Sequence, residues 1–173
     1  WNLIPSQSAN HFGSAASGTA GAIFGLAAMK SEVQTAKVLI SPCDAAKAAD
    51  NELLQAGWSN INTKGAIPVT IGISYIFCAG GDFQRPATVV ALTRNLSSDN
   101  VAAGNWSGAD ENPIPAHAMS GLNKSQGQLV RADSSASQST DADLGASGKV
   151  VKGHINARGG TSPLGPSATG VIR

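Results

Sequence analysis

The chain has 173 residues, and its 12 basic and 11 acidic side chains leave a formal net charge of +1. This length predicts one domain over residues 1–173, and a hydrophobic content of 42% is enough for a core. The charge balance gives no reason to expect nucleic acid as a partner, and no apolar run reaches the roughly 18–20 residues that span a membrane.

The first residues read as a lead-in to the domain. Residues 1–19 are polar and rich in Gly and Ser, which predicts irregular structure. Residues 20–34 have apolar side chains at a rough spacing of three to four, which predicts a helix. Because the chain begins with Trp1 rather than Met, we expect a processed product or an excised fragment.

The next segment predicts a short strand followed by a helix. Residues 38–40 are apolar and β-branched in part, and Pro42 ends the strand because it has no amide hydrogen. Ser41 or Asp44 then caps a helix over residues 45–55, which Gly57 ends.

Two strands are predicted in the middle of the chain. Residues 70–77 alternate between larger and smaller side chains, and residues 87–93 are β-branched in character. The Gly-containing connection between them favours an antiparallel pair. Residues 95–123 follow as a long loop, and loops of this length are usually functional or mobile.

The last third predicts a hairpin, a helix and a tail. Residues 126–132 and 135–138 flank a turn at Asp133-Ser134. Ser139 or Thr140 begins a helix that runs to about Asn156. Residues 159–173 are rich in Gly, Ser and Pro and predict a flexible tail.

Motifs for catalysis are missing from the sequence. There is no GxSxG, no phosphate-binding loop and no GxGxxG. His11, His117 and His154 lie far apart and have no neighbouring His or Cys ligand. The sequence therefore predicts no catalytic residue, no cofactor and no enzyme activity.

The two cysteines, Cys43 and Cys78, allow two interpretations. They are either a disulfide formed in an oxidising compartment or two small buried hydrophobic residues. A metal site is disfavoured, because no CxxC or Cys/His cluster exists.

Asp133, Asp141 and Asp143 form the densest acidic group. Asp141 and Asp143 fall in the first turn of the predicted last helix, where the helix dipole favours anions. A calcium site in the loop is the weaker alternative, because the order of ligands differs from that of an EF-hand.

The three tryptophans, Trp1, Trp58 and Trp106, fall in segments predicted as loops. They either pack these loops onto the core or form a surface that contacts sugar or protein. Trp58 and Trp106 are the candidates for such a binding surface.

Four segments between residue 35 and about residue 155 resemble a known family. Residues 35–44 (TAKVLISPCD) resemble its "TPKILVCPSD" motif, and residues 73–75 (ISY) its "VSYF" strand. Residues 85–95 (RPATVVALTRN) are similar to "RPQTFLSGDRN", and residues 127–139 (GQLVRADSSASQS) to "GNIGLADGSVQQ". The family is that of the prepilin-type, type II secretion-like proteins abundant in Verrucomicrobia and Planctomycetes.

This sequence departs from the family pattern at several points. Cys and Ser are exchanged around Pro42, Asn123 stands where the family has a His, and Ser134 replaces the Gly of the hairpin turn. The hydrophobic N-terminal helix with its peptidase site does not precede Trp1 in this sequence.

The resemblance implies an α+β fold like that of a pilin headpiece. We expect a small antiparallel sheet of about four strands with flanking helices, normally packed on a long N-terminal helix. We therefore expect a non-enzymatic, extracytoplasmic subunit of a pilin- or pseudopilus-like filament, with copies of itself or other pilin-like subunits as partners. The alternative is a secreted binding module for polysaccharide or a surface partner.

Overall fold

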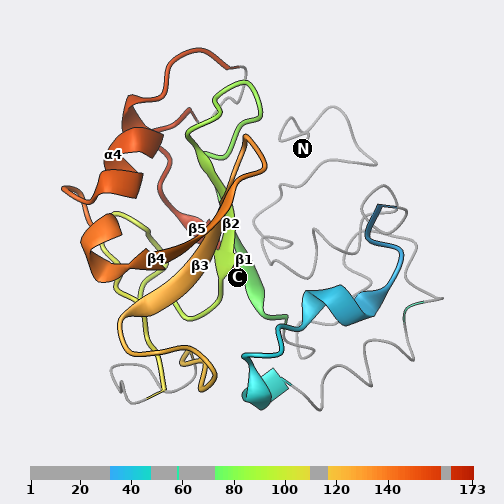
Figure 1. Cartoon of the computed structure of the whole chain (residues 1–173). Helices are drawn as coiled ribbons and strands as arrows, with labels where there is room; N and C mark the ends of the chain where they lie inside the picture. Colours follow the sequence, from blue (N-terminus) through green and yellow to red (C-terminus); the bar gives the residue numbers. More distant parts are fainter. Residues whose placement is uncertain (1–31, 48–57, 59–72, 110–116, 161–164) are drawn as a thin grey trace. The chain divides into compact units, whose positions relative to one another are not determined.

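The computed structural model in Figure 1 describes residues 32–47, 58, 73–109, 117–160 and 165–173. The chain divides into two compact units, although the sequence predicts one domain. The first unit is Trp1–Ser74 with Arg173, and the second is Tyr75–Ile172. The predicted lead-in and the helix predicted from residue 20 lie almost entirely outside the described residues.

The described part of the first unit contains two short 3-10 helices, η3 (Ala36–Leu39) and η4 (Ala45–Lys47). The predicted strand over residues 38–40 is wrong. Thr35 has an extended backbone and its side chain accepts a hydrogen bond from the Lys37 N–H, so the chain turns into η3 instead. Only the start of the predicted helix over residues 45–55 is described, and it is η4.

Ser74 connects the segments around the two 3-10 helices. Its N–H donates to Leu39 O at 3.0 Å. Its hydroxyl accepts the Ser41 N–H at 2.9 Å and donates to Asp44 Oδ2 at 2.9 Å. The Asp44 carboxylate, which directly precedes η4, therefore takes part in a buried hydrogen bond across 30 residues.

The second unit is built on a five-stranded sheet in which every pair of neighbours is antiparallel. Its spatial order is β4-β3-β2-β1-β5. The strands are β1 (Tyr75–Cys78), β2 (Val89–Thr93), β3 (Gln126–Arg131), β4 (Ala136–Thr140) and β5 (Val171–Ile172). The predicted antiparallel sheet is confirmed, with one strand more than expected.

The β3–β4 hairpin is also confirmed. Ser134 occupies its turn with φ of +67°, in the left-handed region that glycine adopts most easily. The Asp133 carboxylate accepts the Ser135 N–H at 2.8 Å, and Ser134 N–H donates to Arg131 O at 3.0 Å. These bonds hold the turn without glycine.

A single α-helix, α4 (Lys149–Asn156), is described in the second unit. Its end at Asn156 is as predicted, but its start is not. Thr140 begins only a 3-10 turn, η6 (Asp141–Asp143), after which Gly145 has φ of +74°. A Cβ at Gly148 would overlap the Leu144 carbonyl, so the chain bends sharply before α4 begins.

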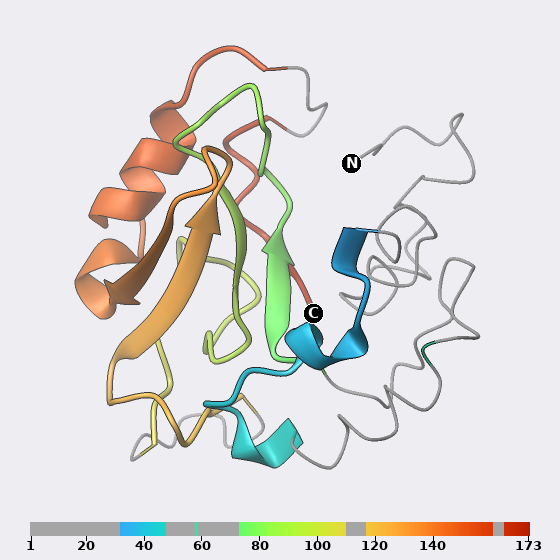
Figure 2. The ribbon, with the colours of Figure 1, turned by 45° about the vertical axis from the view of Figure 1, so that its right-hand side comes forward.

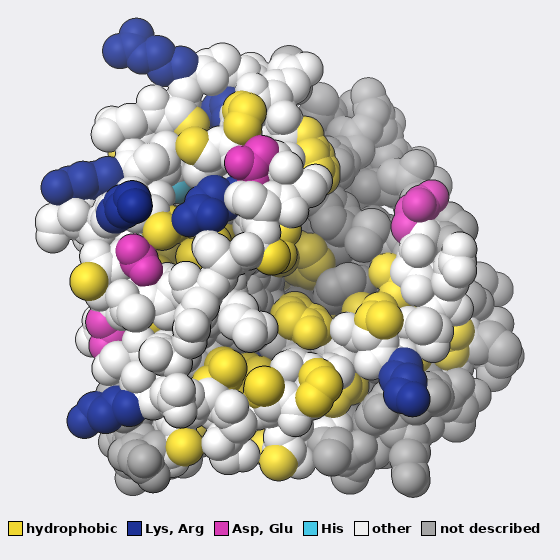
Figure 3. Space-filling model, in the orientation of Figure 1, with side chains coloured by type: hydrophobic (Ala, Val, Ile, Leu, Met, Phe, Trp, Pro, Cys, Tyr) yellow, Lys and Arg dark blue, Asp and Glu magenta, His cyan; other side chains and the backbone are white. Residues whose placement is uncertain are grey.

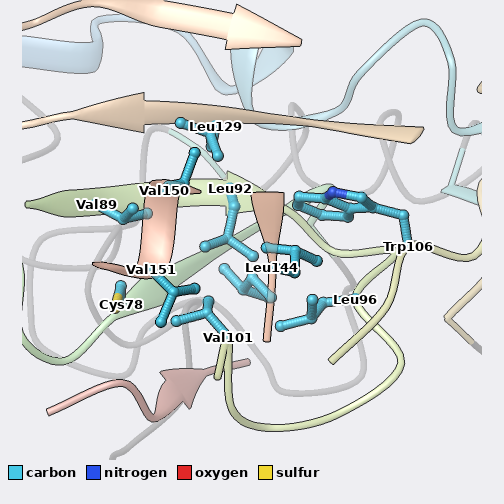
Figure 4. Packing of buried hydrophobic residues seen from close by; sticks show 11 residues of the cluster. Cys78, Val89, Leu92, Leu96, Val101, Trp106, Leu129, Leu144, Val150 and Val151 are labelled. Atoms are coloured by element: carbon cyan, nitrogen blue, oxygen red, sulfur yellow. The ribbon is translucent and has the colours of Figure 1, made fainter. Parts of the chain in front are cut away.

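The core lies between one face of the sheet and α4 (Figures 2 and 4). A bulge in β2 between Val89 and Ala91 lets both Val89 and Leu92 face this core. The eleven residues of the core are Ile76, Cys78, Val89, Leu92, Leu96, Val101, Trp106, Leu129, Leu144, Val150 and Val151.

The C-terminal segment adds an edge strand to the sheet. In β5, Val171 pairs with Cys78 and Ile172 pairs with Phe77. Thr169 O accepts the Val101 N–H at 3.0 Å, and Asp99 O accepts the Val171 N–H at 2.9 Å. The prediction of a flexible tail is therefore wrong for these residues.

Within the described ranges, we find no helix that is both long and apolar enough to cross a membrane.

Candidate functional site

The candidate site is a groove on the face of the sheet opposite to the core. Ile76 and Cys78 of β1 face the core. Because neighbouring residues of a strand point to opposite faces, the Tyr75 side chain lies on the other face, where it lines the groove. The groove has a volume of about 410 Å³. Its lining includes Tyr75, Ala91, Thr93, Gln128, Val130 and Gln138. A volume of this size falls within the range of ligand-binding pockets.

The lining of this groove combines apolar and polar side chains. Val130 is 38% exposed although it is a β-branched apolar residue, one position before the end of β3. Gln138 is exposed, and its amide donates to Gln126 Oε1 at 2.6 Å. Thr93 is buried, and its hydroxyl accepts the Gln128 N–H at 3.0 Å. The groove therefore offers apolar contact with amide groups beside it.

None of the residues that line the groove is charged. On the face drawn in Figure 3, Lys and Arg are interspersed with Asp and Glu among neutral residues. Apolar contact is therefore the main property that the groove offers to a ligand or a partner.

Trp106 belongs to the core and does not form a binding surface (Figure 4). Its side chain is 2% exposed, and its Nε1 donates to Ser139 Oγ at 3.1 Å. Gly127 lies under the ring, where a Cβ would overlap it. The structure therefore favours the packing interpretation for this tryptophan and corrects its assignment as a binding-surface candidate.

Trp58 lies in the first unit and is half-buried. Its Nε1 donates to Gln34 O at 3.1 Å. The two candidate tryptophans are thus in different units, and each has a hydrogen-bond role in its own unit. The third tryptophan, Trp1, lies outside the described residues.

The three acidic residues do not form the calcium site that was the weaker alternative. Asp141 Oδ1 accepts the Trp106 N–H at 2.6 Å, and Asp143 Oδ2 accepts the Thr140 N–H at 2.9 Å. Asp133 is at the hairpin turn, where hydrogen bonds from Ser135 lower the pKa of its carboxyl. In the part of the chain that the structure describes, no three His, Cys, Asp or Glu residues are grouped so that they could hold a metal.

Cys78 and His154 lie close together but do not form a nucleophile and its base. The Sγ of Cys78 is 3.9 Å from Nε2 of His154. Nδ1 of His154 accepts the Val89 N–H at 3.0 Å, so the proton of the neutral ring is on Nε2, 3.1 Å from Ala168 O. Nε2 therefore has no lone pair with which to accept a proton from the thiol. Burial raises the pKa of Cys78 to about 11, which keeps it protonated.

Cys43 and Cys78 are both free thiols in the structure, which does not form the predicted disulfide. Cys78 is packed in the core of the second unit. Cys43 is half-buried in a turn of the first unit, where its N–H donates to Ser41 Oγ at 3.2 Å. The structure thus favours two unbridged cysteines over a disulfide, and thiol counting tests that choice.

The groove was missed by sequence reasoning, which looked for aromatic residues in loops. The alternation over residues 70–77 did contain its signal, because it placed Tyr75 on a face of a strand. His117 is half-buried in the second unit and does not line the groove, and His11 lies outside the described residues.

Comparison with protein-family models, with curated proteins and with solved structures finds no match to this chain.

Proposed function

We propose that this chain is a structural subunit of an extracytoplasmic, pilin- or pseudopilus-like filament that assembles through the groove lined by Tyr75 and Val130. One observation carries the proposal. The described helix of the second unit covers one face of the sheet, while the other face holds a groove whose lining includes the exposed Val130. A sheet face of this kind is typically buried against another layer.

The occupant that we propose is an apolar segment of a neighbouring subunit. The groove is lined by Tyr75, Ala91 and Val130, and apolar residues gain about 25 cal/mol for each Å² that they remove from water. The longest apolar stretch of the sequence, residues 20–29 (AGAIFGLAAM), has small side chains that allow close approach to a sheet. Copies of the chain would thereby be linked one to the next.

The extracytoplasmic location in this proposal comes from the resemblance of residues 35 to about 155 to pilin headpieces. Such subunits act outside the cytoplasmic membrane and have no catalytic role or cofactor. The geometry around Cys78 and His154 agrees with a non-catalytic role, because this pair cannot generate a thiolate.

A pair of matched substitutions tests the proposal. Val130 and Ile155 are each 38% exposed, but only Val130 lines the groove. We expect V130K to weaken assembly, because the lysine places a charge in the groove. In sedimentation velocity, the protein concentration at which assembly begins should rise by a factor of ten or more. I155K, on α4, should assemble like the unchanged chain.

The result that would overturn the proposal is equally clear. If V130K and I155K assemble alike, or if the unchanged chain stays monomeric at millimolar concentration, the groove is not a subunit interface. Circular dichroism of both variants checks that their folds are intact.

A secreted polysaccharide-binding module is the second candidate, and one observation favours it. The groove combines the Tyr75 ring with the amides of Gln128 and Gln138. An aromatic ring beside a few polar groups is a common composition for a small-molecule site.

Glycan-array binding distinguishes this candidate from the first. A sugar-binding groove should lose at least tenfold in affinity in Y75A, whereas W58A, in the other unit, should bind like the unchanged chain. An array without any signal, from a protein that does assemble, would eliminate the binding module.

A further inference from the structure

The imidazole of His154 connects three segments of the second unit. It is 0% exposed and projects from α4. Its Nδ1 accepts the Val89 N–H at 3.0 Å, at the start of β2. Its Nε2 lies 3.1 Å from Ala168 O in the C-terminal segment, residues 165–172. Because an amide N–H can only donate, Nδ1 carries no proton and Nε2 donates to the carbonyl.

The space around the ring is filled. A Cβ added at Gly80 would lie 2.6 Å from Nε2 and would overlap the Ala168 carbonyl. On the side of β1, the Cys78 Sγ lies 3.9 Å from the ring and 3.8 Å from Ala168 O. Turning the ring over would place carbon atoms where the two nitrogens now lie and would lose both hydrogen bonds, so these bonds fix its orientation.

The surroundings do not favour a positive charge on this ring. The charge that reaches it is the guanidinium of Arg85, which disfavours a second cation, and Asp82 is paired with Arg85 at 3.0 Å. On α4 itself, Lys149 and Lys152 are exposed and also positive. From β1 the ring is faced by the Cys78 thiol, and residues 89–93 and 165–172 carry no ionisable side chain.

We propose that His154 is an acid-sensitive latch that holds α4 and the C-terminal segment against the start of β2. A proton on Nδ1 would point at the Val89 N–H, so two donors would face each other without an acceptor. The imidazolium must then leave its buried position to reach water. This movement breaks the bond to Ala168 O and loosens β5, which covers the edge of β1. The inference stands independently of the proposed function.

The direction of the pH dependence follows from linkage. Burial, above all, lowers the pKa of His154 from its ordinary value of 6.5 in the closed form. The open form therefore binds more protons below pH 6.5. The closed form is fully favoured above that pH, and it is lost as the pH falls from 6.5 through the lowered pKa. We expect the opening equilibrium constant to rise by up to about tenfold for each pH unit in this interval.

Hydrogen exchange of the unchanged protein between pH 7.5 and 4.5, expressed as protection factors, tests the latch. Protection should fall at Val89, in α4 and at residues 169–172, while the β3–β4 hairpin keeps its protection. If protection is unchanged everywhere, or if the hairpin opens together with α4, the proposal is wrong.

A variant and a spectroscopic measurement complete the test. H154N offers Val89 an acceptor that does not titrate, so opening should lose its dependence on pH; a slope equal to that of the unchanged chain would overturn the proposal. If H154N does not fold, ¹⁵N chemical shifts of the His154 ring in the unchanged protein test the proposal, because they report which ring nitrogens carry a proton. They should show Nε2–H at pH 7.5, and an imidazolium should appear only as protection at Val89 is lost.

Discussion

Gly127 and Gly153 show how the same residue type has opposite roles at two positions of the second unit. Gly127 lies in β3 against the ring of Trp106, and a Cβ there would overlap the ring. Gly153 lies in α4, where a Cβ would meet nothing within 4 Å. The first position needs glycine for space, whereas the second has no such need.

We therefore expect G127A and G153A to change stability in opposite directions. G127A should lower the free energy of unfolding by about 1–3 kcal/mol, because it overpacks the core against Trp106. G153A should raise it by about 0.5–1 kcal/mol, because alanine favours the helix. Urea denaturation measures both values. If G127A is as stable as the unchanged chain, the Trp106 ring moves aside freely and the overpacking prediction is wrong.

The hydrogen bond between Trp106 and Asp141 is a contact that the sequence does not predict. The sequence indicates that the indole packs somewhere or binds something, and that the carboxylate belongs to the first turn after Thr140. It does not indicate that the Asp141 carboxylate accepts the Trp106 N–H, 35 residues away. Side-chain contacts over such separations depend on how the strands pair.

At the scale of the elements, strong local patterns led to correct predictions. β2 and the β3–β4 hairpin lie where the sequence places them, because β-branched residues and an Asp-containing turn determine them locally. β1 is the exception at its start, because Ile73 and Ser74 belong to the strand predicted over residues 70–77 but precede the observed strand, Tyr75–Cys78. The end of α4 is also correct.

Elements that depend on partners were predicted poorly. The strand expected at residues 38–40 has no described neighbour to pair with, and the Thr35 side chain starts a 3-10 turn in its place. In contrast, Val171 and Ile172 form a strand because β1 offers them an open edge. The long helix expected from Thr140 is divided because Gly145 and Gly148 favour a sharp bend.

For the molecule as a whole, the two cysteines provide a test of redox state, because Cys43 and Cys78 lie in different units and are either bridged or free. Both are thiols in the structure, and Cys78 is buried with its pKa raised to about 11. We expect two labels for each chain when it is denatured without reductant. In the native protein at neutral pH, Cys43 should react and Cys78 should not.

The C43S variant is the control for this measurement, since its single label should appear only on denaturation. A denatured chain that takes no label would show that the two cysteines are bridged after all. Such a bridge would support the oxidising, extracytoplasmic setting that we propose.

Local sequence patterns are sufficient to predict the antiparallel sheet, the strand pairing in the middle of the chain and the hairpin. These features depend on alternation within a strand and on turn chemistry between neighbouring strands. Other features are visible only in the folded chain: α4 covers one face of the sheet, Trp106 is buried, and Tyr75 and Val130 line a groove. The two hydrogen bonds of His154, with Val89 and with Ala168, are also of this kind. A local pattern does not specify such features, because burial and hydrogen-bond partners depend on which distant segments of the chain pack together.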